Sequence, residues 1–439
     1  MRVVHYNLER DVDVDSLGPG DVLVVSYGLL AKDAEDDAHG AFGPHFATVV
    51  VDEAQYLKNH ATKRADAVRR VARDFTIALS GTPLENHLGE LWSVFSIVFP
   101  GLLGDPQTFF ERFRKPIEEK KDAAALAALG SLIAPFILRR TRGQVLQELP
   151  PRQDIVETIE LEPKEKSRYE ALRKACELQF QERDARLTAA QQRIQLFAAL
   201  TRLRQLACDA GLVDKTFKGT SSKLVRLVEL LWTLREEGAK TLVFSQFTTL
   251  LEKAHDLLSD AGHRVAYLDG ATPLAARKKL VEQFQAGEFD VFCISLKAGG
   301  TGLNLTRASY VVHLDPWWNP AVEEQANSRA HRMGQENPVT TYRLVARGTI
   351  EEAILSMHDR KRELVSSVLD GKDGASVMKP EGLLAFIRAR GGGGPARGRE
   401  LAGRDAGRHH GAGGPRERGV GPPVSYPGRV TGDLRSRTG

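Results

Sequence analysis

Cysteine is scarce in this sequence, and the cysteines that occur stand far apart. Cys176, Cys208 and Cys293 form no C-x-x-C pair in 439 residues, which argues against a disulfide framework or a structural zinc site. No apolar run reaches the length that a membrane-spanning helix needs. The first residues, 1–7, lack the long apolar core of a secretory leader. From these absences we expect a protein of a reducing compartment, the cytoplasm.

Positive charge is also missing from most of the chain. The formal net charge is +4, but residues 391–439 hold nine Arg, no Lys and four acidic residues, which leaves the rest at about −1. A nucleic-acid surface would therefore have to come from local basic patches. The same C-terminal residues are rich in Gly, Arg and Pro and poor in apolar side chains, and we predict that they are disordered.

Short apolar segments alternate with helical segments along the remaining sequence, which predicts α/β architecture with parallel sheets. Residues 164–206 are rich in charged residues, Ala and Leu at helical spacing and predict long amphipathic helices. The expected strands are 21–26, 46–51, 76–80, 241–245, 264–268, 290–295 and 310–314.

Two carboxylates, Asp52 and Glu53, follow the strand expected at 46–51. Polar residues at the carboxyl end of a parallel strand lie where open α/β sheets bind ligands. By itself the tetrapeptide DEAQ is a weak signal, because a pair of acids after a strand is usually a solvated turn. Gly300 and Gly302 follow a later strand, and glycines there let backbone N–H groups approach a phosphate closely.

A third pattern lies between Asn319-Pro320, a helix start signal, and Gly334, a stop signal. Gln325, Arg329 and Arg332 stand at i, i+4 and i+7, so we expect them on one helix face. Two guanidiniums and an amide on one face offer a planar set of donors for phosphate oxygens. The alternative is a solvated basic face, and the position after the glycine loop favours phosphate.

Taken together, these segments resemble the Swi/Snf-type family of helicase-like ATPases, superfamily-two proteins that translocate on double-stranded DNA. The resemblance covers about residues 21–370. It includes the DEAH-type box at 52–55, the segment Ser80-Gly-Thr-Pro83 with its continuation through 90–104, and the strand end at 244–247. It implies two RecA-like lobes with parallel sheets, the first incomplete, which use ATP and Mg²⁺.

The resemblance also implies a role for individual residues. Asp52 would hold Mg²⁺, Glu53 would orient or activate the attacking water, and Arg329 and Arg332 would act as arginine fingers on the γ-phosphate. Gln325, Gly300 and Gly302 are expected to contact ATP. The residues expected to touch DNA or to couple it to ATP are Ser80, Gly81, Thr82, Lys297, Trp317 and Trp318.

Two features of the sequence depart from this resemblance or leave it open. Gln55 stands where the family often has His, which we interpret as a tolerated variant. Trp317 and Trp318 suit base stacking, but a hydrophobic anchor at the lobe face is at least as compatible with them.

The implied layout is a partial first lobe at 1–150, a helical connector at 151–220, a second lobe at 221–370, a helical brace at 371–390 and the tail at 391–439. No Gly-x-x-x-x-Gly-Lys-Thr loop occurs in the sequence, although the family carries this Walker A loop before its acidic box. We therefore expect an N-terminally truncated member that does not hydrolyse ATP alone.

Expected partners are double-stranded DNA and a DNA-bound protein complex such as transcription machinery. Two alternatives stay open: a non-enzymatic fragment that binds DNA or a partner, and a strand-separating helicase of another superfamily-two branch.

Overall fold

The computed structural model describes residues 1–6, 13–36, 40–81, 87–140, 145–146, 148–181, 188–299 and 302–358. All the described residues belong to one compact unit, and residues 359–439 lie outside the described residues. The brace predicted at 371–390 and the tail predicted at 391–439 fall outside them too. Among the described helices, none combines the length and apolar character that spanning a bilayer requires.

The N-terminal region, residues 1–140, contains two small parallel sheets. One pairs β1 (Val3–His5) with β2 (Val22–Val24), and the other pairs β3 (Phe46–Val51) with β4 (Arg73–Ala78). One face of the second sheet leaves Val50, Phe75 and Ile77 exposed by 41–57%. The helices of this region are α1 (Tyr27–Glu35), α2 (Lys63–Arg70), α3 (Leu88–Val98), α4 (Pro106–Phe109), α5 (Lys115–Lys120) and α6 (Ala123–Ile133).

The second sheet of the N-terminal region packs its other face on helices. Leu30 of α1, Val68 of α2 and Val94 of α3 share an apolar cluster with Val51 at the end of β3. A separate cluster joins α3 to the segment 106–133, with Leu91 and Phe109 among its buried members. The first of these clusters fixes the ends of β3 and β4 relative to the surrounding helices.

A six-stranded sheet, all parallel, forms the core of residues 148–358. The segments predicted as strands in this half are all strands, because each is a short apolar run that a sheet buries on both faces. The fold class predicted from the sequence, α/β with parallel sheets, is confirmed. The strands in spatial order are β5 (Arg152–Ile159), β10 (Val339–Ala346), β9 (Tyr310–His313), β6 (Thr241–Ser245), β8 (Val291–Ser295) and β7 (Val265–Leu268).

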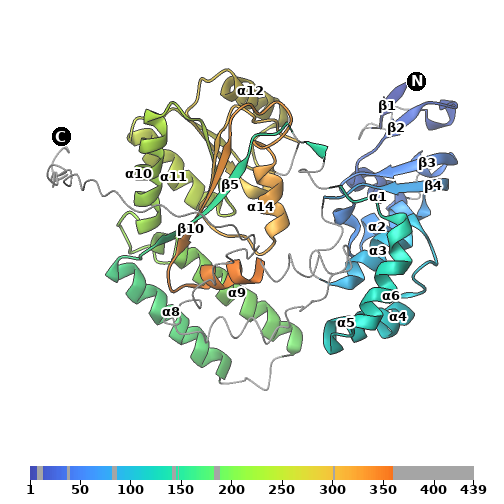
Figure 1. Ribbon diagram of the computed structural model, residues 1–439, viewed down its shortest axis with the longest axis horizontal. Helices are drawn as coiled ribbons and strands as arrows, with labels where there is room; N and C mark the ends of the chain where they lie inside the picture. The colour runs from blue at the N-terminus through green and yellow to red at the C-terminus, as the bar shows by residue number, and fades with distance from the viewer. Residues whose placement is uncertain are drawn as a thin grey trace, which may run out of the picture. The chain divides into compact units, whose positions relative to one another are not determined.

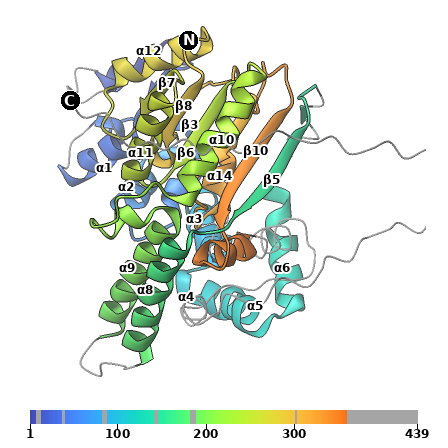
Figure 2. The same cartoon turned by 90° about the vertical axis from the view of Figure 1, so that its left-hand side faces the viewer.

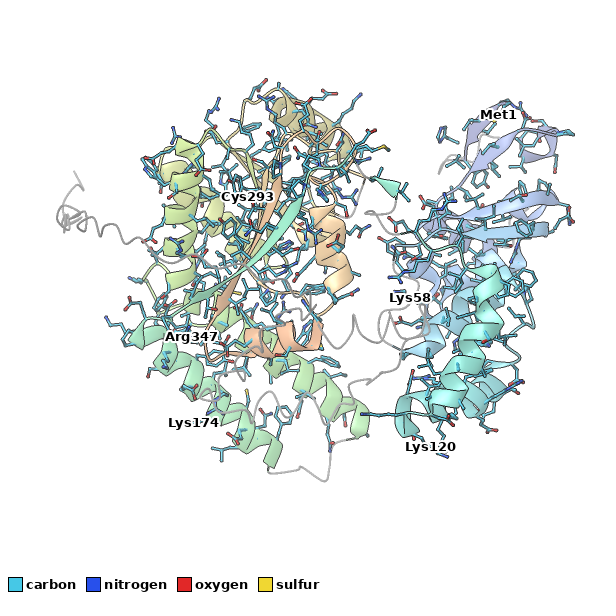
Figure 3. All side chains as sticks on the ribbon, in the orientation of Figure 1. Met1, Lys58, Lys120, Lys174, Cys293 and Arg347 are labelled. Carbon is cyan, nitrogen blue, oxygen red and sulfur yellow. The ribbon has the colours of Figure 1, made fainter. Side chains whose placement is uncertain are left out.

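Helices cover both faces of this sheet. Successive side chains of β6 point to opposite faces and show which helices lie on each. Val243 packs in one apolar cluster with α10 (Ser222–Glu236) and α11 (Thr248–Asp260). Leu242 and Phe244 point to the other face and pack in a second cluster, which includes residues of α12 (Leu274–Gln285) and α14 (Pro320–Asn327). Figures 1 and 2 show the helices of the two sets on opposite sides of the sheet. Cys293 of β8 lies within the sheet, fully buried (Figure 3).

The segment assigned to a helical connector, 151–220, differs from that prediction at its start. It contains two long helices, α8 (Pro163–Gln181) and α9 (Ala189–Cys208), but it opens with β5, which pairs with β10 along eight residues. Ile159 at the end of β5 belongs to the core of the large sheet. The two long helices share a cluster with Ile350 and Ile354 of the helical segment that begins at Ile350. The connector therefore belongs to the second lobe, because pairing and burial join it there.

Candidate functional site

The acidic pair stands at the carboxyl end of β3, where the sequence placed it. The parallel register of β3 and β4 continues past both strands, since Leu79 N donates to Val51 O at 2.8 Å and Ala54 N donates to Leu79 O at 2.9 Å. This pairing brings Ser80 beside the box. Ser80 Oγ donates to Gln55 Oε1 at 2.8 Å, and Gln55 Nε2 donates to Glu53 Oε2. Gln55 therefore links the side chain of Glu53 to that of Ser80, the first residue of the segment 80–83.

The backbone at Glu53 adopts the left-handed conformation, with φ 50° and ψ 50°. This conformation is uncommon outside Gly and tends to occur at functional sites. Tyr27 covers the turn by donating from its hydroxyl to Asp52 O at 2.6 Å. Burial, with the charges of Asp52 and Glu53, raises the pKa of Tyr27 to about 12, so this hydroxyl stays a donor at neutral pH.

Asp52 has the features that a magnesium ligand needs. Its side chain is exposed, and one carboxylate oxygen, Oδ1, accepts a hydrogen bond from Glu53 N at 2.9 Å. In the described part of the chain, no three His, Cys, Asp or Glu side chains are grouped to hold a metal. Mg²⁺ in phosphate-transferring sites is usually held by one or two carboxylates together with phosphate oxygens and water. The residues at the end of β3 fit that mode of binding.

The prediction that Gln325, Arg329 and Arg332 share one helix face is wrong. Helix α14 begins with Asn319 as its cap and Pro320 in its first turn, as predicted, but it ends at Asn327. Short turns follow, in which Arg329 N donates to Ala326 O at 3.0 Å. Arg329 is buried, with an exposed fraction of 8%, whereas the side chain of Arg332 is exposed. The two guanidinium groups therefore lie in different environments.

Side-chain bonds hold Asn327, the last residue of α14, and the turn that follows it. Asn327 Oδ1 lies 2.8 Å from His313 Nε2 of β9. Gln335 Nε2 donates to three carbonyl oxygens, those of Thr306, Ala308 and Ala330, at 2.8–3.1 Å. These bonds hold the turn against the loop that follows the glycines. Gly334 ends the segment with φ +90°, as the predicted stop signal requires.

Only part of the predicted glycine loop and of the segment 80–83 falls within the described residues. Lys297 is exposed on α13 (Leu296–Gly299), and Gly302 has φ +50°. Gly81 lies directly after Ser80, and a Cβ atom added there would have no neighbouring atom within 4 Å. Gly300 and Thr82 lie outside the described residues.

Within the unit 1–392, Gln325 Nε2 donates to Glu53 Oε1 at 3.1 Å. The structure thus connects two residues that the sequence assigned to the same site from segments far apart.

Trp317 and Trp318 surround an arginine that the sequence gave no reason to select. The guanidinium carbon of Arg204, on α9, lies 5.3 Å from the ring centre of each tryptophan and 5.4 Å from that of Phe247. Arg204 Nη2 also donates to Asp315 Oδ2 at 3.2 Å and to Pro316 O at 2.7 Å. Both charged side chains are at most 2% exposed. These contacts agree with the anchor alternative, and contact of the two tryptophans with DNA bases stays a prediction.

Comparison with known proteins finds a family match for each half of the chain. The profile described as "SNF2-related domain" matches residues 2–212, and that described as "Helicase conserved C-terminal domain" matches residues 222–334. The chain is 38% identical over 371 residues to a "Putative ATP-dependent helicase/translocase YwqA" of Bacillus subtilis, with 83% of this chain and 39% of that protein covered.

Two further similarities lie in a human protein and an archaeal structure. The human "TATA-binding protein-associated factor 172" is 32% identical, with 79% of this chain and 22% of that protein covered. A solved Sulfolobus solfataricus "SWI2/SNF2 ATPase core in complex with dsDNA" is 29% identical, with 85% of this chain and 77% of that chain covered and a TM-score of 0.43. The chain spans less than half the length of both curated relatives.

Proposed function

Because the chain belongs to the SNF2-related, Swi/Snf-type family of helicase-like proteins, we propose that it couples ATP hydrolysis to movement along double-stranded DNA. The Bacillus subtilis relative is named an ATP-dependent helicase/translocase, which supports this class of activity. We place the protein with DNA in the cytoplasm, or at the nucleoid in a bacterium.

The observation that carries the proposal is the bridge made by Gln55. Glu53 stands where a residue would orient water for attack on the γ-phosphate, and Ser80 opens the segment that the family resemblance assigns to coupling with DNA. Gln55 hydrogen-bonds both side chains. A shift of the segment 80–83 on DNA binding would therefore move the carboxylate of Glu53 directly. In this proposal Gln55 replaces the His of related boxes in the same connecting role.

The nucleotide contacts are assigned as follows. Asp52 holds Mg²⁺, Glu53 orients water, Gln325 and the glycines at 300 and 302 contact ATP, and Arg329 with Arg332 neutralises charge on the γ-phosphate. Mg²⁺ held by Asp52 would supply positive charge to offset that of the phosphate oxygens. The 439 residues contain no Gly-x-x-x-x-Gly-Lys-Thr loop, so we infer that they do not turn over ATP unless such a loop is supplied. Lys297 and the segment 80–83 contact DNA or couple it to ATP.

A DNA-bound protein complex, such as transcription machinery, is the proposed object of this movement. The similarity to a TATA-binding protein-associated factor supports a partner of that kind.

Phosphate release tests the proposal on two proteins: the chain itself, and a longer chain that adds a phosphate-binding loop segment of the Walker A type. We expect the longer chain to release phosphate faster with duplex DNA than with single strands, and the chain alone to show no stimulation. Glu53→Gln in the longer chain should abolish turnover but keep ATP binding, whereas Glu119→Gln on α5 should change neither. The proposal would be contradicted if duplex DNA did not stimulate phosphate release by the longer chain, or if that chain separated the two DNA strands.

A further inference from the structure

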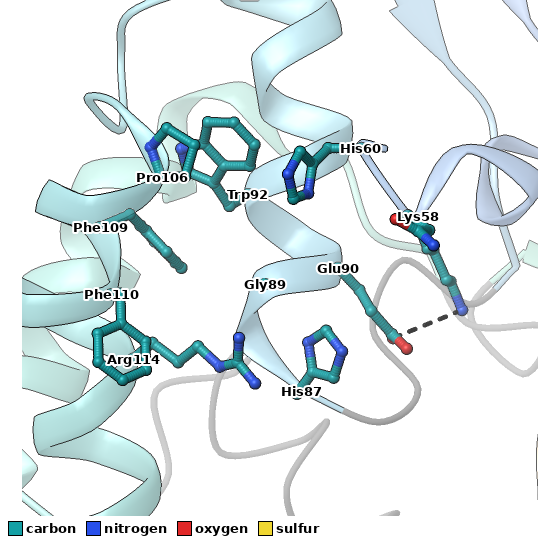
Figure 4. Close-up of a pocket in the computed structure, with 11 residues that line it drawn as sticks. Lys58, His60, His87, Gly89, Glu90, Trp92, Pro106, Phe109, Phe110 and Arg114 are labelled. Carbon is teal, nitrogen blue, oxygen red and sulfur yellow. Dashed lines mark ion pairs between the residues drawn. The ribbon is translucent and has the colours of Figure 1, made fainter. Parts of the chain in front are cut away.

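A pocket in the N-terminal region has no part in the site described above. It encloses about 360 Å³ between the residues after the box, the start of α3, and the helical segment 106–114 (Figure 4). Neither Asp52, Glu53 nor Ser80 lines it. Its volume lies within the range of pockets that hold small molecules.

The side chain of Arg114 lines this pocket, and its two terminal nitrogens are available to a ligand. Glu118 Oε2 accepts from Arg114 Nε at 3.2 Å, and Glu118 Oε1 accepts from Leu88 N at 2.7 Å. This arrangement fixes the guanidinium from behind. Neither terminal nitrogen of Arg114 has a hydrogen-bond partner among the described residues. Arg114 also ends a five-residue π-helix, Phe110–Arg114, a distortion that is frequent at functional sites.

Gly89 allows a second nitrogen to come close to this arginine. A Cβ atom at position 89 would lie 3.0 Å from His87 Nδ1 and 3.2 Å from Arg114 Nη1. His87 Nδ1 is buried and has no hydrogen-bond partner in the described part of the chain. Figure 4 shows the side chains of Arg114 and His87 directed toward one another beside Gly89. The absence of a side chain at position 89 thus leaves room next to two unpartnered nitrogen groups.

Aromatic side chains form the other walls. Trp92 and Phe109 line the pocket, and Trp92 Nε1 donates to Gly104 O at 3.0 Å, which holds the indole in place. The one buried acid of the lining, Glu90, pairs with Lys58 at 3.8 Å. Glu90 is paired with Lys58 and Glu118 with Arg114, so the charges beside the pocket are balanced, and the terminal nitrogens of Arg114 and Nδ1 of His87 are left as hydrogen-bonding groups for a ligand.

We propose that this pocket binds a small organic oxyanion, a phosphate or carboxylate group carried on an aromatic ring. The guanidinium would bind two oxygens of the anion with its parallel N–H groups, and His87 Nδ1 would donate in the tautomer or charge state that carries a proton there. The ring would pack against Trp92 and Phe109. This binding goes beyond the proposed function and needs neither ATP nor DNA.

Calorimetric titration of the full chain tests this proposal with phenyl phosphate, benzoate and inorganic phosphate. We expect phenyl phosphate or benzoate to bind, and inorganic phosphate to bind at least about tenfold more weakly because it lacks the ring. Arg114→Gln should weaken the aromatic ligand by about tenfold or more. Arg112→Gln, an exposed neighbour outside the pocket, should bind like the parent.

Gly89→Ala keeps every charge and fills the space beside the nitrogens, so it should weaken binding with the thermal midpoint close to that of the parent chain. This variant separates loss of the pocket from loss of the fold, since Arg114→Gln also removes a partner of Glu118. The proposal is overturned if neither aromatic anion binds up to about 10 mM, if inorganic phosphate binds as tightly as phenyl phosphate, or if folded Gly89→Ala and Arg114→Gln both bind like Arg112→Gln.

Discussion

Lys223 and Glu351, 128 positions apart, form an ion pair in the interior of the second lobe. Lys223 Nζ lies 2.7 Å from both carboxylate oxygens of Glu351 and donates to Leu314 O at 2.8 Å. Neither side chain is more than 1% exposed. The pair connects the start of α10, which packs on the large sheet, to the helical segment that begins at Ile350, which packs with α8 and α9.

Lys223→Met should reduce the free energy of unfolding by about 3–5 kcal/mol, because Glu351 would remain buried without its counterion. The double change Lys223→Met with Glu351→Leu should cost less than the single change, since no unpaired charge remains. Urea unfolding followed by circular dichroism measures both. The exposed pair of Lys278 and Glu282 supplies the control: Lys278→Met should shift stability by less than about 0.5 kcal/mol. If the double change lowered the free energy of unfolding by the sum of the two single changes, the pair would not stabilise the fold.

Arg204→Lys should loosen the tryptophan segment, because an ammonium lacks the planar fork that reaches Asp315 and Pro316 while stacking on aromatic rings. Burial raises the pKa of Asp315 even beside Arg204, so weaker pairing would favour the protonated acid further. We expect a red shift of tryptophan emission and a lower urea midpoint. Arg202→Lys, on the exposed side of α9, is the matched control. Equal spectra for the two variants would remove Arg204 from this role.

Asp290 should make stability depend on acid pH. Burial acts to raise its pKa, but hydrogen bonds from Arg264 and Lys240 outweigh burial and hold the pKa well below the ordinary 3.8. A lowered pKa stabilises the fold at pH values above the unfolded value and loses this effect as pH falls toward the folded value. The stability gap between the parent and Asp290→Asn should therefore be constant from about pH 7 to 5 and narrow below that. Urea midpoints of the parent and of Asp290→Asn, measured across this pH range, check the trend.

Arg329 and Arg332 should differ in their effect on stability although the proposed function assigns them one role. In a chain that carries a phosphate-binding loop, each change to Ala should lower kcat by at least about 100-fold with little change in nucleotide Kd. Arg332→Ala should unfold like the parent, because the side chain is exposed, whereas Arg329→Ala should also lower the thermal midpoint. Arg329→Lys serves as the milder variant. An effect confined to KM would withdraw the finger assignment.

Limited proteolysis should give a resistant fragment that starts between about residues 139 and 152. Arg139, Arg140 and Arg142 offer trypsin sites before β5, and β5 itself pairs with β10 and contributes Ile159 to the core. Mass spectrometry of the fragment identifies its first residue. A fragment that starts between residues 215 and 240 would show that β5, α8 and α9 separate from the sheet easily, which the packing does not predict.

The exposed apolar face of β3 and β4 should make the N-terminal region prone to association. Val50, Phe75 and Ile77 are each 41–57% exposed on one face of strands whose other face contacts the helices, and uncovered apolar sheet surface promotes aggregation. Phe75→Lys should reduce light scattering at high protein concentration. Unchanged scattering in this variant, with the fold intact, would show that another surface drives association.

Features that depend on residues close in sequence were predictable. The strands at 46–51, 241–245 and 290–295 are short apolar runs of the kind that forms parallel strands, and those at 241–245 and 290–295 are buried on both faces of their sheet. The position of Asp52 and Glu53 after β3 follows from the same pattern. Asn319 and Pro320 start α14 as their cap geometry requires. Local chemistry decided each of these.

Contacts between distant segments decided the rest. After α14 ends at Asn327, backbone turns satisfy its last carbonyl groups, and side-chain bonds from His313 and Gln335, which no periodicity reveals, hold these turns in place. The bridge through Gln55 needed the register of β3 with β4, and the enclosure of Arg204 needed α9 beside the loop after β9. The sequence by itself therefore determined the α/β class and the location of the acidic box. Only the tertiary structure decided which partners each buried charge and each strand edge would have, because that choice is set by burial and pairing across the whole fold.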